Sequence, residues 1–332
     1  MKVADLHCDT MAELWYSQWD NKKPMELKRN TLHVDLEKLI KGDYLLQNFA
    51  IFINLGRNLD PLESALYQID IFYSEMEKNK DKICVAKSYN DIERNMQEGK
   101  ISAILTLEEG ASCKGKLNFL RILYQLGVRM MTLTWNYENE LGFPNLLSKR
   151  SPSKYEYEFE KGLGLKKKGI DFLNEMERLG IIVDVSHLSD EGFYDVLKYT
   201  KTPFVASHSN ARTLCRHHRN LTDDMIQKLA ERGGVIGLNY SPNFLEEGET
   251  EEDCHSNVLL MASHARYITN IGGIACLSLG SDFDGIGGKL EMKDCSMLPL
   301  LLEAFKKEGF KESEIEAIFY KNVLRLYKEV LH

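Results

Sequence analysis

The sequence predicts a (β/α)8 barrel of the TIM type, formed by residues 1–332 as a single domain. Two observations carry this prediction: eight short apolar runs recur along the chain, and amphipathic segments with helical spacing separate many of them. Alternating strands and helices imply parallel pairing. A doubly wound open sheet more often has about five to seven strands and a glycine-rich first turn, which is missing here.

The strand candidates are runs of β-branched and other apolar residues, as is typical of parallel strands buried on both faces. In chain order they are VADLHCD (3–9), LLQNFAIFIN (45–54), ISAILTL (101–107), MMTLTW (130–135), IIVDVS (181–186), PFVAS (203–207), GVIGLNY (234–240) and CLSLGS (276–281).

Helices are expected where apolar residues recur at helical spacing, and several of these segments end at glycine, as helices commonly do. They cover residues 116–127, 165–180, 190–199, 222–234 and 256–273. Three connections after strands are long, at 10–44, 136–160 and 240–254. In a barrel they would overhang the face that carries active sites, so we expect an enzyme, with 136–160 as a candidate lid.

The composition restricts the kind of partner. Acidic residues outnumber basic ones by 50 to 42, which gives a net charge of −8 and argues against a nucleic-acid or membrane partner. No apolar run approaches the roughly 18 residues of a membrane span, so we expect a cytoplasmic protein with a small-molecule partner. The seven cysteines form no CxxC pair and are expected to be reduced and structural.

Polar side chains that can bind metal recur at the ends of the predicted strands. They are His7 and Asp9 after the first strand, Glu108 and Glu109 after the third, His187 after the fifth, His208 after the sixth, and Asp282 and Asp284 after the eighth. The carboxyl ends of barrel strands meet at one mouth, so we expect these side chains to converge there. Because side chains alternate along a strand, His7 and Asp9 should point inward and Cys8 outward.

Imidazoles and carboxylates in this combination are zinc ligands, although manganese, cobalt and iron(II) accept the same donors. A catalytic zinc ion uses about three protein ligands, and this set has more. Two metals that share a carboxylate fit the count better, and such a pair can activate water and polarise a carbonyl group. The residues alone leave open whether Glu108 or Glu109, and Asp282 or Asp284, takes part.

Several motifs in order resemble the membrane dipeptidase (renal dipeptidase-like) family of zinc peptidases, among the amidohydrolase-type metal-dependent hydrolases. They are "DLHCDT", "LTLEEGASCKGKLNFLRILYQLGVRMMTLTW", "VDVSHLS", "ASHSNARTLCRHHRN" and "GSDFDG", and the resemblance extends from residue 3 to "KNVLRLY" near the end of the sequence.

The resemblance implies two Zn²⁺ ions per chain. His7 and Asp9 match the ligands of the first ion, His187 and His208 those of the second, and Glu108 the carboxylate that bridges them. Asp282 matches the acid that orients a metal-bridging hydroxide and moves its proton to the leaving amine. Arg219 matches the arginine that holds the free carboxylate of a dipeptide, and an arginine fork suits a carboxylate well.

The expected activity is therefore hydrolysis of dipeptides with a free C-terminal carboxylate. The resemblance further implies acceptance of L-D dipeptides and a homodimer. The sequence departs from the animal members at Trp135, where they have a histidine thought to stabilise the tetrahedral intermediate. Indole donates one hydrogen bond and carries no proton, so this role passes to a metal, to Asn136 or to another residue.

Two other classes of function remain open. One is a different amidohydrolase-type enzyme, such as an N-acyl amino acid hydrolase, a lactonase or a deaminase, because the same metal cluster activates water for many substrates. The other is a metal-binding scaffold without turnover.

Several remaining polar residues are expected outside the reaction centre. At most one of His217 and His218 should face substrate, because adjacent residues point in different directions. His33, His255, His264 and His332 lack a strand-end position and are expected at the surface. Asp284 is expected to support a loop or the metal ligands.

Overall fold

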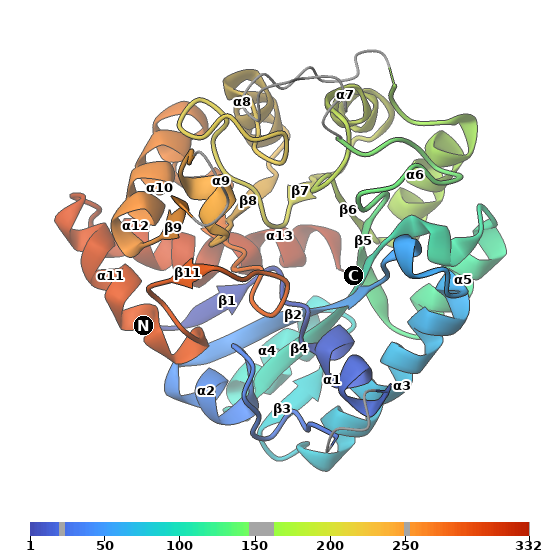
Figure 1. Ribbon diagram of the computed structural model, residues 1–332, viewed down its shortest axis with the longest axis horizontal. Coiled ribbons are helices and arrows are strands. Elements are labelled where there is room, and N and C mark those ends of the chain that lie inside the picture. Colours follow the sequence, from blue (N-terminus) through green and yellow to red (C-terminus); the bar gives the residue numbers. More distant parts are fainter. Residues whose placement is uncertain (20–23, 146–162, 249–252, 332) are drawn as a thin grey trace.

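A computed structural model describes residues 1–19, 24–145, 163–248 and 253–331, and it shows a closed barrel of eight parallel strands with helices around it (Figure 1). Around the barrel the strands are β1 (Val3–Asp5), β2 (Tyr44–Phe52), β4 (Ile101–Glu108), β5 (Val128–Thr132), β6 (Ile182–Asp184), β7 (Val205–Ala206), β8 (Val235–Leu238) and β10 (Leu277–Leu279). The barrel closes where β1 pairs with both β2 and β10. The predicted fold class is confirmed.

Most of the helices surround the strands, whereas α13 (Asn322–Val330) crosses one end of the barrel, as Figure 1 shows. The α-helices of the described residues are α1 (Thr10–Trp19), α2 (Leu36–Lys41), α3 (Pro61–Lys78), α4 (Tyr89–Gln97), α5 (Leu117–Gln125), α6 (Lys167–Leu179), α7 (Asp190–Tyr199), α8 (Asp223–Glu231), α9 (Pro242–Leu245), α10 (Val258–Gly272), α11 (Leu298–Lys307), α12 (Glu312–Glu316) and α13. The five predicted helices correspond to α5, α6, α7, α8 and α10. Their apolar faces pack against the outside of the barrel.

Helix α13 covers the end of the barrel at which the strands begin. Its buried residues share one core cluster with residues of seven barrel strands, such as Ala4, Ile104 and Val235. The Tyr327 hydroxyl donates a hydrogen bond to Asn48 Oδ1 on β2, 2.7 Å away. The opposite end, where the strands finish, is therefore the end that remains available for a site.

The structure adds elements that the apolar runs did not predict. The short strand β3 (Ile83–Val85) pairs with the beginning of β4, and β5 pairs with β4 from Leu105 onward. The connection 10–44 contains α1 and α2, and strands β9 (His255–Ser256) and β11 (Lys289–Leu290) pair with each other in a separate two-stranded sheet. Most of the candidate lid, 146–160, lies outside the described residues.

No helix of the described ranges has the length and apolar character that crossing a lipid bilayer requires. All seven cysteines are free, as expected.

Two glycines permit a close approach of backbones beside the predicted ligand His208. A Cβ atom at Gly237 would lie 1.9 Å from the carbonyl oxygen of Ser207, and one at Gly280 would lie 1.8 Å from the same oxygen. A methyl group at either position must therefore displace the backbone that leads into His208.

We predict that Gly237→Ala destabilises the protein by about 1–3 kcal/mol, the usual cost of overpacking a core. Urea unfolding would measure the difference. Gly287→Ala is the matched control, because a Cβ there meets nothing within 4 Å, and it should change stability by less than about 0.5 kcal/mol. Equal stability of the two variants would contradict the prediction.

Candidate metal centre

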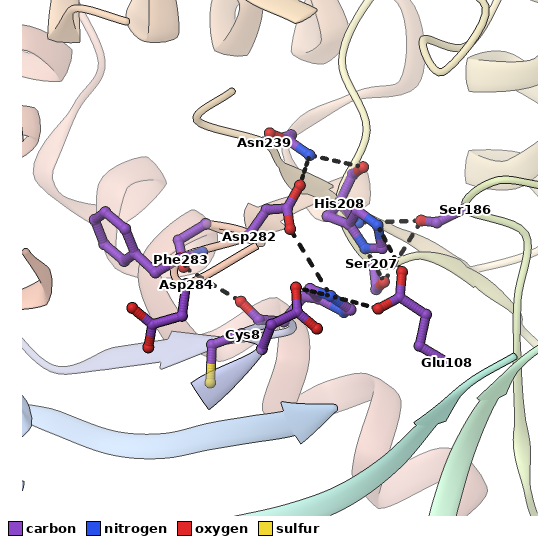
Figure 2. A network of polar contacts seen from close by, with 12 residues as sticks. Cys8, Glu108, Ser186, Ser207, His208, Asn239, Asp282, Phe283 and Asp284 are labelled. Carbon is purple, nitrogen blue, oxygen red and sulfur yellow. Dashed lines mark hydrogen bonds and ion pairs between the residues drawn. The ribbon is translucent and has the colours of Figure 1, made fainter. Parts of the chain in front are cut away.

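The predicted metal ligands come together at the carboxyl ends of the strands, and Figure 2 shows two of them, Glu108 and His208, beside Asp282. Glu108 is the last residue of β4, and the other ligands follow the ends of β1, β6 and β7. Each predicted ligand, and Asp282 after β10, has at most 9% of its surface exposed. Five barrel strands therefore supply one buried cluster.

The two carboxylate oxygens of Glu108 face different partners. Oε2 lies 3.3 Å from His7 Nε2, whereas Oε1 lies 3.0 Å from His187 Nε2 and 3.6 Å from His208 Nε2. A carboxylate in this position can bind one cation through each oxygen.

His7 is the centre of the first group of donors. Its Nε2 lies 3.5 Å from Asp9 Oδ2 and 3.9 Å from Asp282 Oδ1. The donor atoms of His7, Asp9 and Asp282 all lie within 4.8 Å of one another, and so do those of His7, Glu108 and His208. Cys8 points away, with its Sγ on the carbonyl oxygen of Asn48 at 3.3 Å, as the alternation along the strand predicts.

Glu109 does not join this cluster. It has a positive φ of 125°, and its carboxylate accepts hydrogen bonds from the backbone of Ala111, 2.8 Å away, and of Trp135, 3.1 Å away. Burial raises the pKa of Glu109 to about 7. Its role in the described structure is to hold the turn after β4.

Hydrogen bonds on the far side of two imidazole rings set their orientation. His187 Nδ1 lies 2.8 Å from Asn136 Oδ1, and His208 Nδ1 lies 2.7 Å from Ser207 Oγ, which in turn bonds to Asp184. These contacts leave both Nε2 atoms facing the cluster, 3.0 Å apart. Two nitrogen lone pairs at this distance suit a shared cation, and such support is typical of metal-binding histidines.

The electrostatics of the cluster also fit a bound cation. Burial lowers the pKa of His187 and His208 well below the ordinary value, so both rings are neutral, as metal ligands must be. Burial and the charge of Glu108 raise the pKa of Asp9 to about 6. His7 Nε2 and Asp9 Oδ1 are buried without a hydrogen-bond partner among the described residues. Carboxylates this crowded and buried are costly unless a cation compensates them.

Asp282 is held by a residue that the sequence did not single out. Asn239 Nδ2 donates to Asp282 Oδ2 at 2.9 Å and also to the carbonyl oxygen of His208 (Figure 2). Burial raises the pKa of Asp282 to about 7. Asn239 directly follows β8, so the strand-end rule that found the ligands could have found it too.

A cavity of about 620 Å³ opens onto the cluster. Arg219 lines it, and its Nε is buried without a hydrogen-bond partner among the described residues. Burial lowers the pKa of Arg219 to about 10, but the guanidinium stays charged at neutral pH. Trp135 and Asn136 line the same cavity, and the Trp135 ring packs edge-on against Phe52 with centroids 4.9 Å apart. The predicted substrate-binding residues thus lie around one space.

His217 and His218 both line the cavity, with ring centroids 4.2 Å apart, so the reason given for expecting only one of them to face substrate does not hold. The segment is a turn, in which the Asn220 backbone N–H bonds to the carbonyl oxygen of His217, so the alternation of a strand does not apply.

Two histidines expected at the surface are partly or fully buried. His264 is 1% exposed, and its ring bonds to the backbone N–H of Ala211 and the carbonyl oxygen of Leu245. The His33 ring accepts a hydrogen bond from the backbone of Asp284, whose carboxylate in turn accepts one from Thr10. This is the supporting role expected of Asp284. His255 is exposed, and His332 lies outside the described residues.

The chain matches the family described as membrane dipeptidase (peptidase family M19) over residues 1–332. It is 32% identical over 313 residues to an uncharacterized dipeptidase of Schizosaccharomyces pombe, and the aligned region covers 90% of this chain and 72% of that protein. It is 30% identical over 309 residues to the dipeptidase aclJ of Aspergillus oryzae, and the aligned region covers 90% of this chain and 70% of that protein.

Solved structures share the fold. One is a metallopeptidase from Rhodobacter sphaeroides with a phosphinate mimic of the dipeptide L-Ala-D-Ala, with a TM-score of 0.87, 23% identity and 99% of each chain covered. Another is the dipeptidase AC, with a TM-score of 0.88, 24% identity, and 100% of this chain and 99% of that chain covered.

We predict that Ser207→Ala weakens zinc binding by about 10–100-fold, because His208 loses the partner of its Nδ1. Competition with a chromogenic chelator would measure the affinity without relying on activity. Ser278→Ala is the matched control, since the Ser278 hydroxyl is also buried but has no hydrogen-bond partner among the described residues. The same affinity in both variants would show that Ser207 does not support the site.

Proposed function

The chain belongs to the membrane dipeptidase family (peptidase family M19) of metallo-dipeptidases, and we propose that it is a zinc-dependent enzyme for dipeptides with a free C-terminal carboxylate, including L-D dipeptides. The observation that carries the proposal is the placement of Glu108 and Arg219 in one cavity. Glu108 faces two groups of metal donors, and Arg219 offers a buried cation for which the described residues supply no ion-pair partner.

The donor set fits two ions. His7 and Asp9 would hold one, His187 and His208 the other, and Glu108 would contribute one oxygen to each. Zinc in such a site supplies Lewis acidity, which acidifies water and polarises a carbonyl group.

Asp282 is the proposed acid–base group. Asn239 fixes its Oδ2, so Oδ1 remains directed toward His7 and the cluster. From this position Oδ1 takes the proton of the attacking water and returns it to the nitrogen of the leaving amine.

Arg219 is the proposed clamp for the substrate's carboxylate. Its guanidinium lies over the Phe244 ring, 5.5 Å from the centroid, which limits how it can turn. Two parallel hydrogen bonds from an arginine fix both the distance and the plane of a carboxylate. A dipeptide held there places its one peptide bond at the cluster, so the enzyme would select dipeptides over longer peptides.

Trp135 and Asn136 complete the proposed substrate site. Trp135 forms an apolar wall in place of a proton-carrying histidine. Asn136 Oδ1 accepts the hydrogen bond of His187 Nδ1, and this contact orients the amide, whose Nδ2 is the group that can donate to the substrate's carbonyl oxygen. The homodimer that the family resemblance implies, and the cytoplasmic location expected from the sequence, remain predictions.

We predict that the purified enzyme binds close to two zinc ions per chain and hydrolyses dipeptides such as L-Ala-D-Ala. Asp282→Asn should lower kcat by about 10²–10⁴-fold, the usual contribution of a general acid–base group, while metal analysis finds the ions largely retained. If the protein bound one ion per chain, and bound it without His187 and His208, this would contradict a site in which two ions share Glu108. Turnover of lactones or acyl amino acids but not dipeptides would identify a different hydrolase, and no turnover at all a scaffold.

We predict that wild type discriminates strongly between a dipeptide and its C-terminal amide. Arg219→Gln should lower kcat/KM for the free acid by about 30-fold or more, because a buried charge pair is lost. The amide serves as the internal control, since its rate should change much less in the variant. If amidation leaves wild-type turnover unchanged, Arg219 has a different role.

A further inference from the structure

Helix α1 forms a wall of the cavity that leads outward from the metal donors. Asp9, directly before the helix, lines the cavity together with Glu13 and Tyr16. These residues are spaced by three or four positions, so they lie on one helical face. Seven residues at 1.5 Å rise place Tyr16 about 10 Å from Asp9. Tyr16 thus marks the outer part of the same cavity.

An arginine caps this outer part. Arg57 also lines the cavity, and its Cζ lies 3.9 Å from the centroid of the Tyr16 ring. No carboxylate of the residues that the structure describes lies within ion-pair distance of Arg57. A cation that stacks on an aromatic ring, and for which the described part of the chain supplies no carboxylate, is suited to bind an anionic group.

The turn that carries Arg57 is fixed by its own contacts. Asn54 Oδ1 accepts a hydrogen bond from the backbone N–H of Gly56 at 2.9 Å, and Asn58 has a left-handed φ of 55°. A Cβ at Gly56 would lie 2.4 Å from the Tyr137 hydroxyl, so that side chain presses directly on the turn. Arg57 therefore starts from a defined position at the cavity wall.

Arg57 and Arg219 come from opposite sides of the barrel. Arg57 follows β2 and Arg219 follows β7, and these strands are four places apart in the ring of eight (Figure 1). The metal donors lie between them. A dipeptide with its carboxylate on Arg219 and its peptide bond at the donors must extend its N-terminal residue toward Tyr16 and Arg57.

We propose that Arg57, supported by Tyr16, selects dipeptides whose N-terminal residue has a carboxylate side chain. This inference rests on the proposed function, because that function sets the direction in which the substrate lies. Dipeptides with glutamate or aspartate at the first position would thus place one carboxylate on Arg219 and the other on Arg57.

The test compares kcat/KM for Glu-Ala and Gln-Ala, which differ only in the charge of the first side chain. The metal-loaded wild type should favour Glu-Ala by about fivefold, as expected for a partly exposed ion pair. Arg57→Gln should bring the ratio of kcat/KM for Glu-Ala to that for Gln-Ala close to one. Arg57→Glu should make Glu-Ala the poorer substrate of the two and should make Lys-Ala a better substrate than either. Arg178→Gln, an exposed arginine on α6 away from the cavity, is the control and should keep the wild-type ratio.

The outcomes separate this inference from the proposed function. If wild type hydrolyses both peptides and Arg57→Gln leaves their ratio unchanged, the selectivity role of Arg57 is overturned and the dipeptidase proposal stands. If wild type hydrolyses neither peptide, nor any other dipeptide, both are overturned.

Discussion

The burial of negative charge at the carboxyl ends of the strands is the constraint on which the rest of the structure depends. Asp9, Glu108 and Asp282 are buried and all lie within 4 Å of His7 Nε2. Burying several carboxylates together is energetically costly unless a cation or a proton compensates their charge. Burial accordingly raises the pKa of Asp9 and Asp282. The supporting contacts of Asn239, Asn136 and Ser207 follow from this need, because each directs a donor atom toward the shared space.

The fold and the cluster's location could be predicted because they depend on regular patterns. Apolar runs identify strands buried on both faces, and the carboxyl ends of parallel strands must meet at one mouth. Alternation along a strand correctly placed His7 and Cys8 on opposite faces. The choice of Glu108 rather than Glu109 came from a family resemblance, and the geometry brings Glu108, not Glu109, into the cluster.

The remaining details depend on turns, where no repeating pattern applies. His187, Asp282 and Asp284 have positive φ values of 70°, 61° and 71°, a conformation that few residues other than glycine adopt. Their side-chain directions therefore could not be derived from strand or helix spacing. The shared orientation of His217 and His218 has the same origin, since the His217 ring packs against Phe244 from a distant segment. His264 is a different case, because it lies among the buried residues of α10 with Met261, Ala265 and Ile268, so the helical spacing itself could have predicted its burial.

The order of the strands around the barrel also has a consequence for biosynthesis. β1 has β2 as one neighbour and β10, more than 270 residues later, as the other, and Asp282 follows β10. The ribosome therefore releases His7 and Asp9 long before their last partner exists. Such distant closure is slow compared with local folding. The complete cluster, with Asp282 beside the predicted ligands, thus forms only after β10 has joined the barrel, so the reaction centre is a late product of folding.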